Sequence, residues 1–453
     1  MACQALLDVE QHSSFADDTL DRLTQSAGLE ARDRALAFEL VYGVFRRRST
    51  LDWRLAQIAD RPLDRLPLIV RMALRLGAYQ LFHLERVPPS AAVNESVALV
   101  KASGKHWTGF VNAMLRTLAK APAPMWPDPI ADPALAYGIQ YGCPQWLAQR
   151  WIDRYGSTRA QALCEATLAV PPLTLRVNIL RVNRESLLQA FLKAGVEARA
   201  TDVSPVGVVV EARGLVTRLP LFEEGGFYVE DEGAQLIAPI LDPQPGERVL
   251  DACAAPGGKA SHLAVLMQDQ GEIVAVERAP PRARLLKENC QRLGIGSITV
   301  WQADIAQRPV RAGVGLAASG LNEALRKPFD RVLLDAPCSG LGVLRRHPEG
   351  KWLKTEAGLA QHAREQSTLL DRVSLVLRPG GVLVYSTCST EPEENEQIID
   401  GFLQRHPDFS RESVALWLPE TGRSLITPEG HFSTIGALRS MDGFFAARLR
   451  KGD

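Results

Sequence analysis

Apolar residues in the first 120 positions recur with the spacing of helices. In residues 31–48, a broad apolar face is formed by Ala35, Leu36, Phe38, Leu40 and Val41, and the arginines lie outside it. The stretches 66–84, 91–103 and 110–120 repeat this pattern, and Pro67 opens the first of them. Strand-like alternation is scarce here, so the pattern predicts an all-helical domain over residues 1–125.

The next region changes in composition and then in periodicity. Residues 121–133 (APAPMWPDPIADP) are rich in proline, which is typical of a segment without regular structure. We interpret residues 126–140 as a linker. Helical patterns at 144–156 and 184–195 then mix with strand patterns at 173–178, 207–212 and 225–231, which predicts a small α+β domain over residues 141–235.

From residue 236 to residue 453, short apolar runs alternate with helical patterns. The predicted strands are 248–253, 272–277, 298–304, 331–337 and 381–388. Continuous apolar strands separated by helices are typical of a parallel sheet that is covered on both faces. The fold class of this third domain is therefore predicted to be α/β and Rossmann-like.

The bulk composition excludes several classes of protein. Hydrophobic residues make up 46% of the chain. The sequence contains no run of about 18 apolar residues, which a membrane-spanning helix would need. The acidic start lacks a basic and then apolar leader, so we expect a cytoplasmic protein. The seven cysteines are scattered and form no CxxC pair, which argues against a disulfide framework and against a metal site.

The charge distribution points weakly to a nucleic-acid partner. The whole chain is neutral, with 52 basic and 52 acidic residues. Residues 41–120, however, hold 13 basic and 5 acidic residues, an excess of +8. Such an excess fits RNA binding or simply a solvated helical face, and charge alone does not separate the two.

A glycine-rich loop follows the first predicted strand of the third domain. It comprises Cys253, Ala254, Ala255, Pro256, Gly257, Gly258 and Lys259. Glycines at this place let the backbone approach a ligand closely. The loop matches neither GxGxxG nor a Walker motif, because its glycines are adjacent and Ala260 follows the lysine.

Two acids end the next predicted strands. Glu277 could accept hydrogen bonds from ribose hydroxyls, and Asp304 could accept one from an adenine amine. With the loop, they predict a bound adenosine. Both S-adenosylmethionine and a nicotinamide cofactor contain adenosine, so this step leaves the two open, although the loop pattern disfavours the second.

Cysteines follow the fourth and fifth predicted strands, in Asp335-Ala-Pro-Cys338 and Ser-Thr-Cys388. Cysteines at these positions suit covalent catalysis. Methylation of cytosine is a reaction that needs it, because carbon 5 of cytosine is a weak nucleophile and a thiolate that adds to carbon 6 activates it. Asp335 could hold the ring nitrogen and the amine edge of the base. Packed cysteines are the plain alternative. The spacing does not decide which cysteine attacks.

The motifs of residues 245–450 resemble the NOL1/NOP2/Sun family of RNA cytosine-5 methyltransferases. They are VLDACAAPGGKASHLA, FDRVLLDAPCSGLGVLRRHPEGKW, VYSTCSTEPEENE and MDGFFAARL. The resemblance implies a mainly parallel seven-stranded sheet and S-adenosylmethionine as cofactor. It implies Cys388 as nucleophile, Cys338 in breakdown of the adduct, and cofactor contacts from residues 253–259, Glu277, Asp304 and Asp335. Glu349-Gly350 departs from the Asp-Ile of many relatives and lies outside the chemistry.

The front of the chain resembles the NusB-type RNA-binding domain, through RALAFELVYGV, VPPSAAVNESVALVK and FVNAMLRTL. This combination implies a monomeric enzyme that methylates cytosine 967 of 16S ribosomal RNA. We expect phosphate contacts from a set of basic residues: Arg46, Arg47, Arg48, Arg345, Arg346 and His347. The alternatives are the same chemistry on tRNA or 23S rRNA, and a non-catalytic RNA-binding assembly factor.

Overall fold

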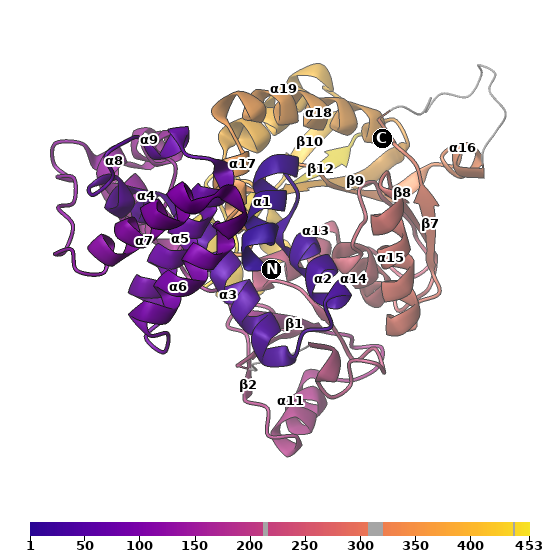
Figure 1. The fold of residues 1–453 in the computed structure, drawn as a ribbon. Coiled ribbons are helices and arrows are strands. Elements are labelled where there is room, and N and C mark those ends of the chain that lie inside the picture. The colour runs from indigo at the N-terminus through magenta and orange to yellow at the C-terminus, as the bar shows by residue number, and fades with distance from the viewer. Residues whose placement is uncertain (212–215, 307–319, 438–439) are drawn as a thin grey trace. The chain divides into compact units, whose positions relative to one another are not determined.

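The computed structural model describes residues 1–211, 216–306, 320–437 and 440–453 (Figure 1). The chain forms two compact units. The first contains residues 1–170 and 344–356, and the second contains residues 171–343 and 357–453. The second unit holds both the small α+β sheet and the Rossmann-like sheet. The chain leaves this unit after residue 343 and returns to it at residue 357.

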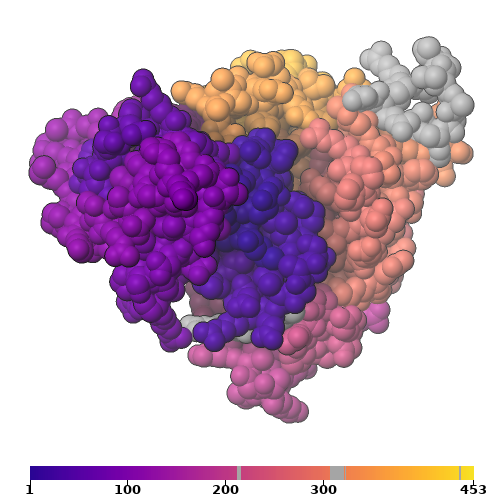
Figure 2. All heavy atoms as spheres, viewed as in Figure 1, coloured from indigo at the N-terminus to yellow at the C-terminus, as the bar shows by residue number. Residues whose placement is uncertain are grey.

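The first unit is helical, as the apolar spacing predicts. Its helices are α1 (Ala2–His12), α2 (Ala16–Ser26), α3 (Ala31–Arg46), α4 (Arg48–Ala56), α5 (Leu68–His83), α6 (Pro89–Leu99), α7 (Lys105–Leu118), α8 (Pro133–Gln140), α9 (Gln145–Tyr155), α10 (Ser157–Ala166) and α17 (Gly350–Leu353). Helix α5 is central, with nine buried residues. Figure 2 draws all heavy atoms of residues 1–170 as spheres in indigo to purple.

Small residues allow the helices around α5 to approach closely. A Cβ atom on Gly43 of α3 would lie 2.0 Å from the Tyr79 ring, and one on Gly77 would lie 2.4 Å from Leu115. These glycines therefore have a packing role, because a larger side chain would force the helices apart.

Part of the segment predicted as a linker is a helix. Helix α8 occupies residues 133–140, which lie within the range 126–140. The carboxylate of Asp132 accepts a hydrogen bond from the Leu135 amide at 2.9 Å, and Pro133 occupies the first turn. Proline in the first turn favours the start of a helix. The prediction of a linker, which relied on the proline-rich composition, is therefore wrong for residues 133–140.

A segment far along the chain completes the first unit. The Trp352 indole donates a hydrogen bond to the Phe45 carbonyl at 2.7 Å. Lys351 is fully buried, and its ammonium donates to the carbonyls of Gly142 and Arg46 at 3.1 and 3.3 Å. Residues 344–356 are therefore part of this unit's core.

The second unit begins with a four-stranded antiparallel sheet in the order β2-β3-β1-β4. Its elements are β1 (Leu173–Val177), α11 (Arg184–Lys193), β2 (Ala198–Ala200), β3 (Gly207–Val210) and β4 (Phe227–Val229). Leu187 and Phe191 of α11 pack with Leu175, Val208 and Phe227 of the strands. The predicted α+β character of this region is confirmed.

The larger sheet has the order β10-β12-β9-β8-β5-β6-β7, and β11 pairs with β12 beside it. Its strands are β5 (Arg248–Asp251), β6 (Glu272–Glu277), β7 (Ile298–Gln302), β8 (Phe329–Asp335), β9 (Leu377–Thr387), β10 (Phe409–Glu412), β11 (Phe432–Ser433) and β12 (Phe445–Lys451). Strands β5 to β9 pair in parallel, whereas β10, β11 and β12 are antiparallel additions. The seven-stranded, mainly parallel sheet is confirmed, with β11 as a short eighth strand.

Helices cover both faces of this sheet. Its helices are α12 (Glu232–Gln235), α13 (Ile237–Leu241), α14 (Gly258–Leu266), α15 (Pro280–Leu293), α16 (Gly320–Ala324), α18 (Glu356–Ser374) and α19 (Glu396–Arg405). Leu250, Leu334 and Leu383 pack toward α18 and α19, and their neighbours Val249, Leu333 and Val384 pack toward α13 and α14. Alternate residues of one strand thus enter two cores, as expected of continuous apolar strands.

In the described part of the chain, every helix is too short or too polar to span a lipid bilayer. The same residues contain no group of three or more histidine, cysteine or acidic side chains arranged to hold a metal ion.

Candidate active site

The site lies at the carboxyl ends of strands β5, β8 and β9. Asp251 is paired with Leu333 in the register of β5 and β8, and Asp335 with Ser386 in that of β8 and β9. The strands run in parallel, so the residues that follow them meet at one edge of the sheet. In α/β sheets this edge is the usual place for a ligand.

The glycine-rich loop crosses this edge and leads into α14. Its Ala254 amide donates to the Val276 carbonyl of β6 at 2.9 Å, and Asn289 donates to the Pro256 carbonyl at 3.0 Å. Gly257 has a φ of +107°, and a Cβ on Gly258 would lie 2.8 Å from a Glu230 oxygen. A side chain at either glycine is therefore excluded, by backbone conformation or by space.

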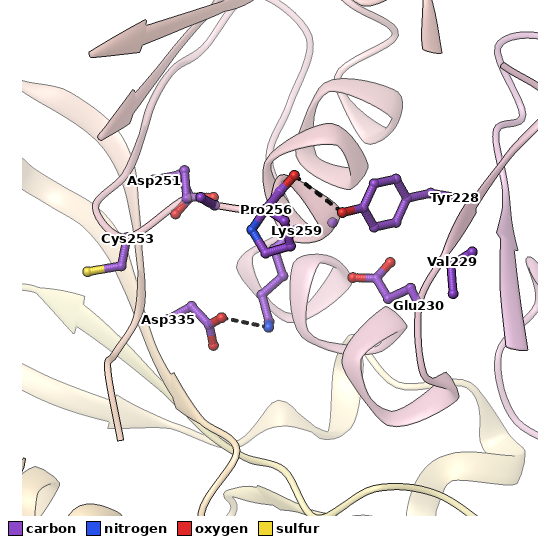
Figure 3. A pocket seen from close by; sticks show the side chains of 11 residues that line it. Tyr228, Val229, Glu230, Asp251, Cys253, Pro256, Lys259 and Asp335 are labelled. Atoms are coloured by element: carbon purple, nitrogen blue, oxygen red, sulfur yellow. Dashed lines mark hydrogen bonds and ion pairs between the residues drawn. The ribbon is translucent and has the colours of Figure 1, made fainter. Parts of the chain in front are cut away.

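A cavity of about 160 Å³ opens beside the loop (Figure 3). It is lined by Tyr228, Val229, Glu230, Asp251, Cys253, Ala254, Ala255, Pro256, Gly258, Lys259 and Asp335. Figure 3 shows the Lys259 ammonium directed at Asp335, at a distance of 2.8 Å. The loop, predicted from sequence as a ligand site, therefore borders a cavity that contains one lysine and three acids.

Two of these acids are buried without full compensation. Asp251 is 1% exposed, and neither of its oxygens has a hydrogen-bond partner of good geometry among the described residues. Burial, followed by the charge of Asp335, raises the pKa of Asp251 to about 7. Burial also raises the pKa of Glu230, although Arg176 lies 3.2 Å away. Such acids fit a ligand that brings a positive group or hydroxyl donors.

Glu277 and Asp304 lie at the neighbouring strand ends but do not line this cavity. A Glu277 oxygen accepts from the Ala279 amide at 2.8 Å, and an Asp304 oxygen accepts from the Ala306 amide at 2.9 Å. Each carboxylate therefore stabilises the turn after its strand. Their contact with ribose and adenine stays a prediction.

The two predicted cysteines meet at the same edge. The sulfur atoms of Cys338, after β8, and Cys388, after β9, lie 3.3 Å apart, and both cysteines are free and half-buried. Asp335 accepts a hydrogen bond from the Ser386 hydroxyl at 2.7 Å as well as from Lys259. The sequence prediction that these three residues share one site therefore agrees with the structure.

The surroundings of the two sulfurs differ. The hydrogen bond with Cys338 lowers the pKa of Cys388. Burial and the charge of Asp335 oppose this shift, and the nearby Lys259 ammonium supports it. The pKa of Cys338 is raised by this same hydrogen bond, by burial and by the negative charge of Glu394. The asymmetry favours a thiolate at Cys388 and a protonated thiol at Cys338. The directions of the two pKa shifts therefore favour one assignment, whereas the spacing in the sequence leaves both open.

Comparison with known proteins agrees with the motifs. A family model described as 16S rRNA methyltransferase RsmB/F matches residues 238–450, a NusB family model matches residues 1–120, and a ferredoxin-like domain of RsmF/B-like methyltransferases matches residues 143–217. The probable ribosomal RNA small subunit methyltransferase B of Synechocystis is 38% identical over 100% of this chain and 98% of its own length. That of Bacillus subtilis is 34% identical over the same shares. The chain belongs to the RsmB/F methyltransferase family.

Solved structures agree with this membership. The crystal structure of PH0851 covers 99% of this chain and 97% of its own, with a TM-score of 0.82 at 24% identity, and so has the same fold. A methyltransferase homologue from Pyrococcus horikoshii covers 70% of this chain and 99% of its own, with a TM-score of 0.58 at 29% identity. As a member of the RsmB/F family, the chain is an RNA methyltransferase with a NusB domain, as its motifs imply.

One predicted RNA contact in the first unit needs a correction. Arg345 is only 3% exposed, so its side chain is enclosed by protein and is not offered to a phosphate at the surface. The Arg46 guanidinium donates to the Arg345 carbonyl at 3.1 Å. Arg48 pairs with Glu10 at 3.0 Å and lies 4.9 Å from the centre of the Trp352 ring. The charge pattern could not reveal that Arg46 and Arg48 lie beside residues 344–356. Both are half-buried, and their contact with RNA stays a prediction.

The remaining three predicted contacts are half-buried. They are Arg47, Arg346 and His347. His347 lies 3.6 Å from carboxylate oxygens of both Asp17 and Glu349. Their contact with RNA remains a prediction.

Sequence reasoning missed several residues of the site. Asp251 ends the strand directly before the glycine-rich loop, and that position was a usable signal. Tyr228 and Glu230 come from the small sheet, and nothing in the local pattern linked them to the cavity. Glu394 was one acid among several in the stretch TEPEENE.

Proposed function

We propose that this protein transfers a methyl group from S-adenosylmethionine to carbon 5 of cytosine 967 in 16S ribosomal RNA, through a covalent adduct with Cys388. The observation that carries the proposal is the pair of sulfurs 3.3 Å apart, beside the cavity that contains Lys259 and Asp335. The names of the relatives support ribosomal RNA of the small subunit as the substrate.

The residues of the cavity suit the cofactor. The glycine-rich loop lets the backbone come close. The buried carboxylates of Asp251 and Glu230, the second of which also pairs with Arg176, can accept hydrogen bonds from a cationic amino group or from hydroxyls. We propose that residues 253–259, Glu277, Asp304 and Asp335 hold it. When bound, S-adenosylmethionine supplies an electrophilic methyl group and leaves as the neutral thioether.

The residues of the chain act on the cytosine in sequence. The Cys388 thiolate adds to carbon 6, and the electron pair of the 5,6 double bond becomes available at carbon 5, which takes the methyl group. A base then removes the proton from carbon 5, the double bond re-forms, and Cys388 leaves as a thiolate. Cys338, which is held protonated, donates to that departing sulfur, and Asp335 orients the ring edge.

The target base must leave its stack to reach the sulfurs. Extrusion costs least from a single strand or a loop. We therefore propose that a loop of free or partly assembled 16S rRNA, which an assembly intermediate would expose, is the substrate, and that the chain acts as a monomer in the cytoplasm.

The decisive experiment uses two cysteine variants. Cys388→Ala is expected to abolish both methylation and covalent capture of RNA, and Cys338→Ala is expected to accumulate an enzyme–RNA adduct seen as a slow band on a denaturing gel. Bisulfite sequencing of 16S rRNA, 23S rRNA and tRNA from a deletion strain identifies the target. An adduct that appears only without Cys388 would reverse the two roles, and unchanged methylation by Cys388→Ala would refute the mechanism.

A further inference from the structure

A buried carboxylate connects the two cysteine loops. Glu394 is 0% exposed. One of its oxygens accepts from the Ser339 amide at 2.7 Å and from the Gln366 amide group at 3.1 Å. The other accepts from the hydroxyls of Ser339, at 2.5 Å, and Ser389. Four donors therefore compensate the burial of this acid.

The two serines are the direct neighbours of the two cysteines. Ser339 follows Cys338 and Ser389 follows Cys388. Their hydroxyl oxygens lie 3.3 Å apart, the same separation as the two sulfurs. Because the loops follow different strands, their spacing depends on bonds across the gap. Glu394 accepts two of them, from the amide and the hydroxyl of Ser339, and the Gly342 amide donates a third to the Cys388 carbonyl at 2.9 Å.

The backbone of Glu394 is itself anchored. The Tyr385 hydroxyl of β9 donates to the Glu394 carbonyl at 2.5 Å. The adjacent Asn395 accepts from Thr387 at 2.5 Å and donates to the Ser389 carbonyl at 3.0 Å. The carboxylate therefore extends from a rigid support toward both loops, which distinguishes it from an acid that caps a single turn.

We propose that Glu394 is a positioning residue, which holds the loops of Cys338 and Cys388 at the spacing that lets both sulfurs act on one cytosine ring. This proposal rests on the proposed function, because the spacing of the two sulfurs matters only if both act on the same cytosine. The negative charge of Glu394 acts on the pKa of both thiols in the same direction, upward, so its effect on their spacing is the part of the proposal that the structure supports.

The length and the charge of Glu394 can be tested separately. Glu394→Asp keeps the charge but withdraws it by one carbon–carbon bond, about 1.5 Å, so that it cannot reach both serines. Glu394→Gln keeps the reach but presents an NH₂ group to donors that need an acceptor. Glu420→Gln, at a side chain that is 87% exposed, is the matched control.

The first measurement reports sulfur spacing without RNA. Diamide oxidises two neighbouring thiols to a disulfide and is itself reduced to the hydrazine. The wild type and Glu420→Gln are expected to form the Cys338–Cys388 disulfide rapidly, and both Glu394 variants at least about tenfold more slowly. Thermal unfolding checks that each variant is folded. Folded Glu394 variants that oxidise at the wild-type rate, or a wild type that fails to form the bond, would overturn the proposal.

The second measurement separates positioning from a general loss of structure. During turnover, the Glu394 variants are expected to show a larger fraction of enzyme held as adduct, at least threefold above the wild type, because Cys338 no longer meets the departing sulfur. Mere loss of folded protein would lower total activity and leave that fraction unchanged. Should both Glu394 variants fail to fold, Ser389→Ala removes one donor, and it must show the same two changes in smaller degree for the proposal to stand.

The two proposals fail separately. If Cys388→Ala abolishes methylation while the Glu394 variants have wild-type spacing and adduct fraction, only the positioning role is lost. If Cys388→Ala still methylates, the covalent mechanism itself is lost.

Discussion

Two pairs of cysteines in this molecule share the same local electrostatics and differ in their access. Cys143 and Cys164 of the first unit are hydrogen-bonded to each other, and this bond, with some help from Lys351, lowers the pKa of Cys143 to about 6. Both are at most 1% exposed. Cys338 and Cys388 of the second unit show the same pairing of a raised and a lowered pKa, but they are half-buried at the edge of a sheet.

This contrast teaches that a stabilised thiolate alone does not make a nucleophile. Around Cys143 the compensating lysine is fully buried and donates to the carbonyls of Gly142 and Arg46. Around Cys388 the compensating lysine borders a cavity and pairs with Asp335. We therefore expect access at a strand end to separate a reactive sulfur from a structural one.

Removing each low-pKa sulfur gives the largest expected difference. Cys388→Ala should lower the rate of RNA methylation by at least about 10³-fold, as loss of a covalent nucleophile does. Cys143→Ala should leave that rate within about twofold at temperatures where the protein stays folded. Single-turnover assays with labelled methyl donor measure both. A large loss of rate in folded Cys143→Ala would break the contrast.

Alkylation compares the same two sulfurs in one protein. With iodoacetamide, native Cys388 should be modified at least about 100-fold faster than Cys143, because only Cys388 is accessible. In denaturant the two rates should converge. Peptide mass spectrometry of timed samples reads both sites, and equal native rates would show that access does not separate them.

The lysine beside the enclosed pair is expected to affect stability. Lys351→Met leaves the carbonyls of Gly142 and Arg46 without their donor and should lower the free energy of unfolding of the first unit by about 2 kcal/mol. Denaturant titration with hydrogen exchange in α3 and α9 measures this change, with the exposed Lys101→Met as control.

The effect of Lys351 should depend on pH. Burial lowers the pKa of Lys351 from 10.5 to about 8, so the unfolded chain binds more protons between these values. The stability of the wild type relative to Lys351→Met should therefore rise from pH 8 to pH 10.5. A difference that is constant with pH would show that the buried ammonium does not titrate as described.

A buried acid at the accessible edge gives the smallest of these effects. Asp251→Asn should weaken the binding of S-adenosylmethionine about tenfold, since a charged acceptor is replaced by a neutral one. The pKa of Asp251 is raised to about 7, so wild-type affinity should increase from pH 6 to pH 8 as the carboxyl loses its proton. Isothermal titration calorimetry should find that increase absent from the variant.

Local pattern predicted most of the fold and the centre of the site. Continuous apolar strands predict the parallel sheet. In such a sheet, the residues at the carboxyl end of each strand are candidates for contact with a ligand. For this reason the sequence predicts Lys259, Asp335, Cys338 and Cys388 as members of one site.

What sequence could not predict depends on residues that are distant along the chain. The charge pattern does not show that Arg48 lies beside Glu10 and Trp352, because these residues are 38 and 304 positions away in the sequence. Helix α8 was missed because Pro133 is a helix breaker at most positions but a favourable first residue. Glu394 was missed because only its hydrogen bonds distinguish it from the acids beside it.

The return of residues 344–356 to the first unit has a consequence for synthesis. The first 170 residues emerge from the ribosome well before Lys351 and Trp352 exist. Until those residues are made, the space that they fill must stay open or be occupied by something else. The helical unit therefore cannot finish folding until the strand that carries Asp335 has been translated. Folding of the first unit thus depends on synthesis of most of the second.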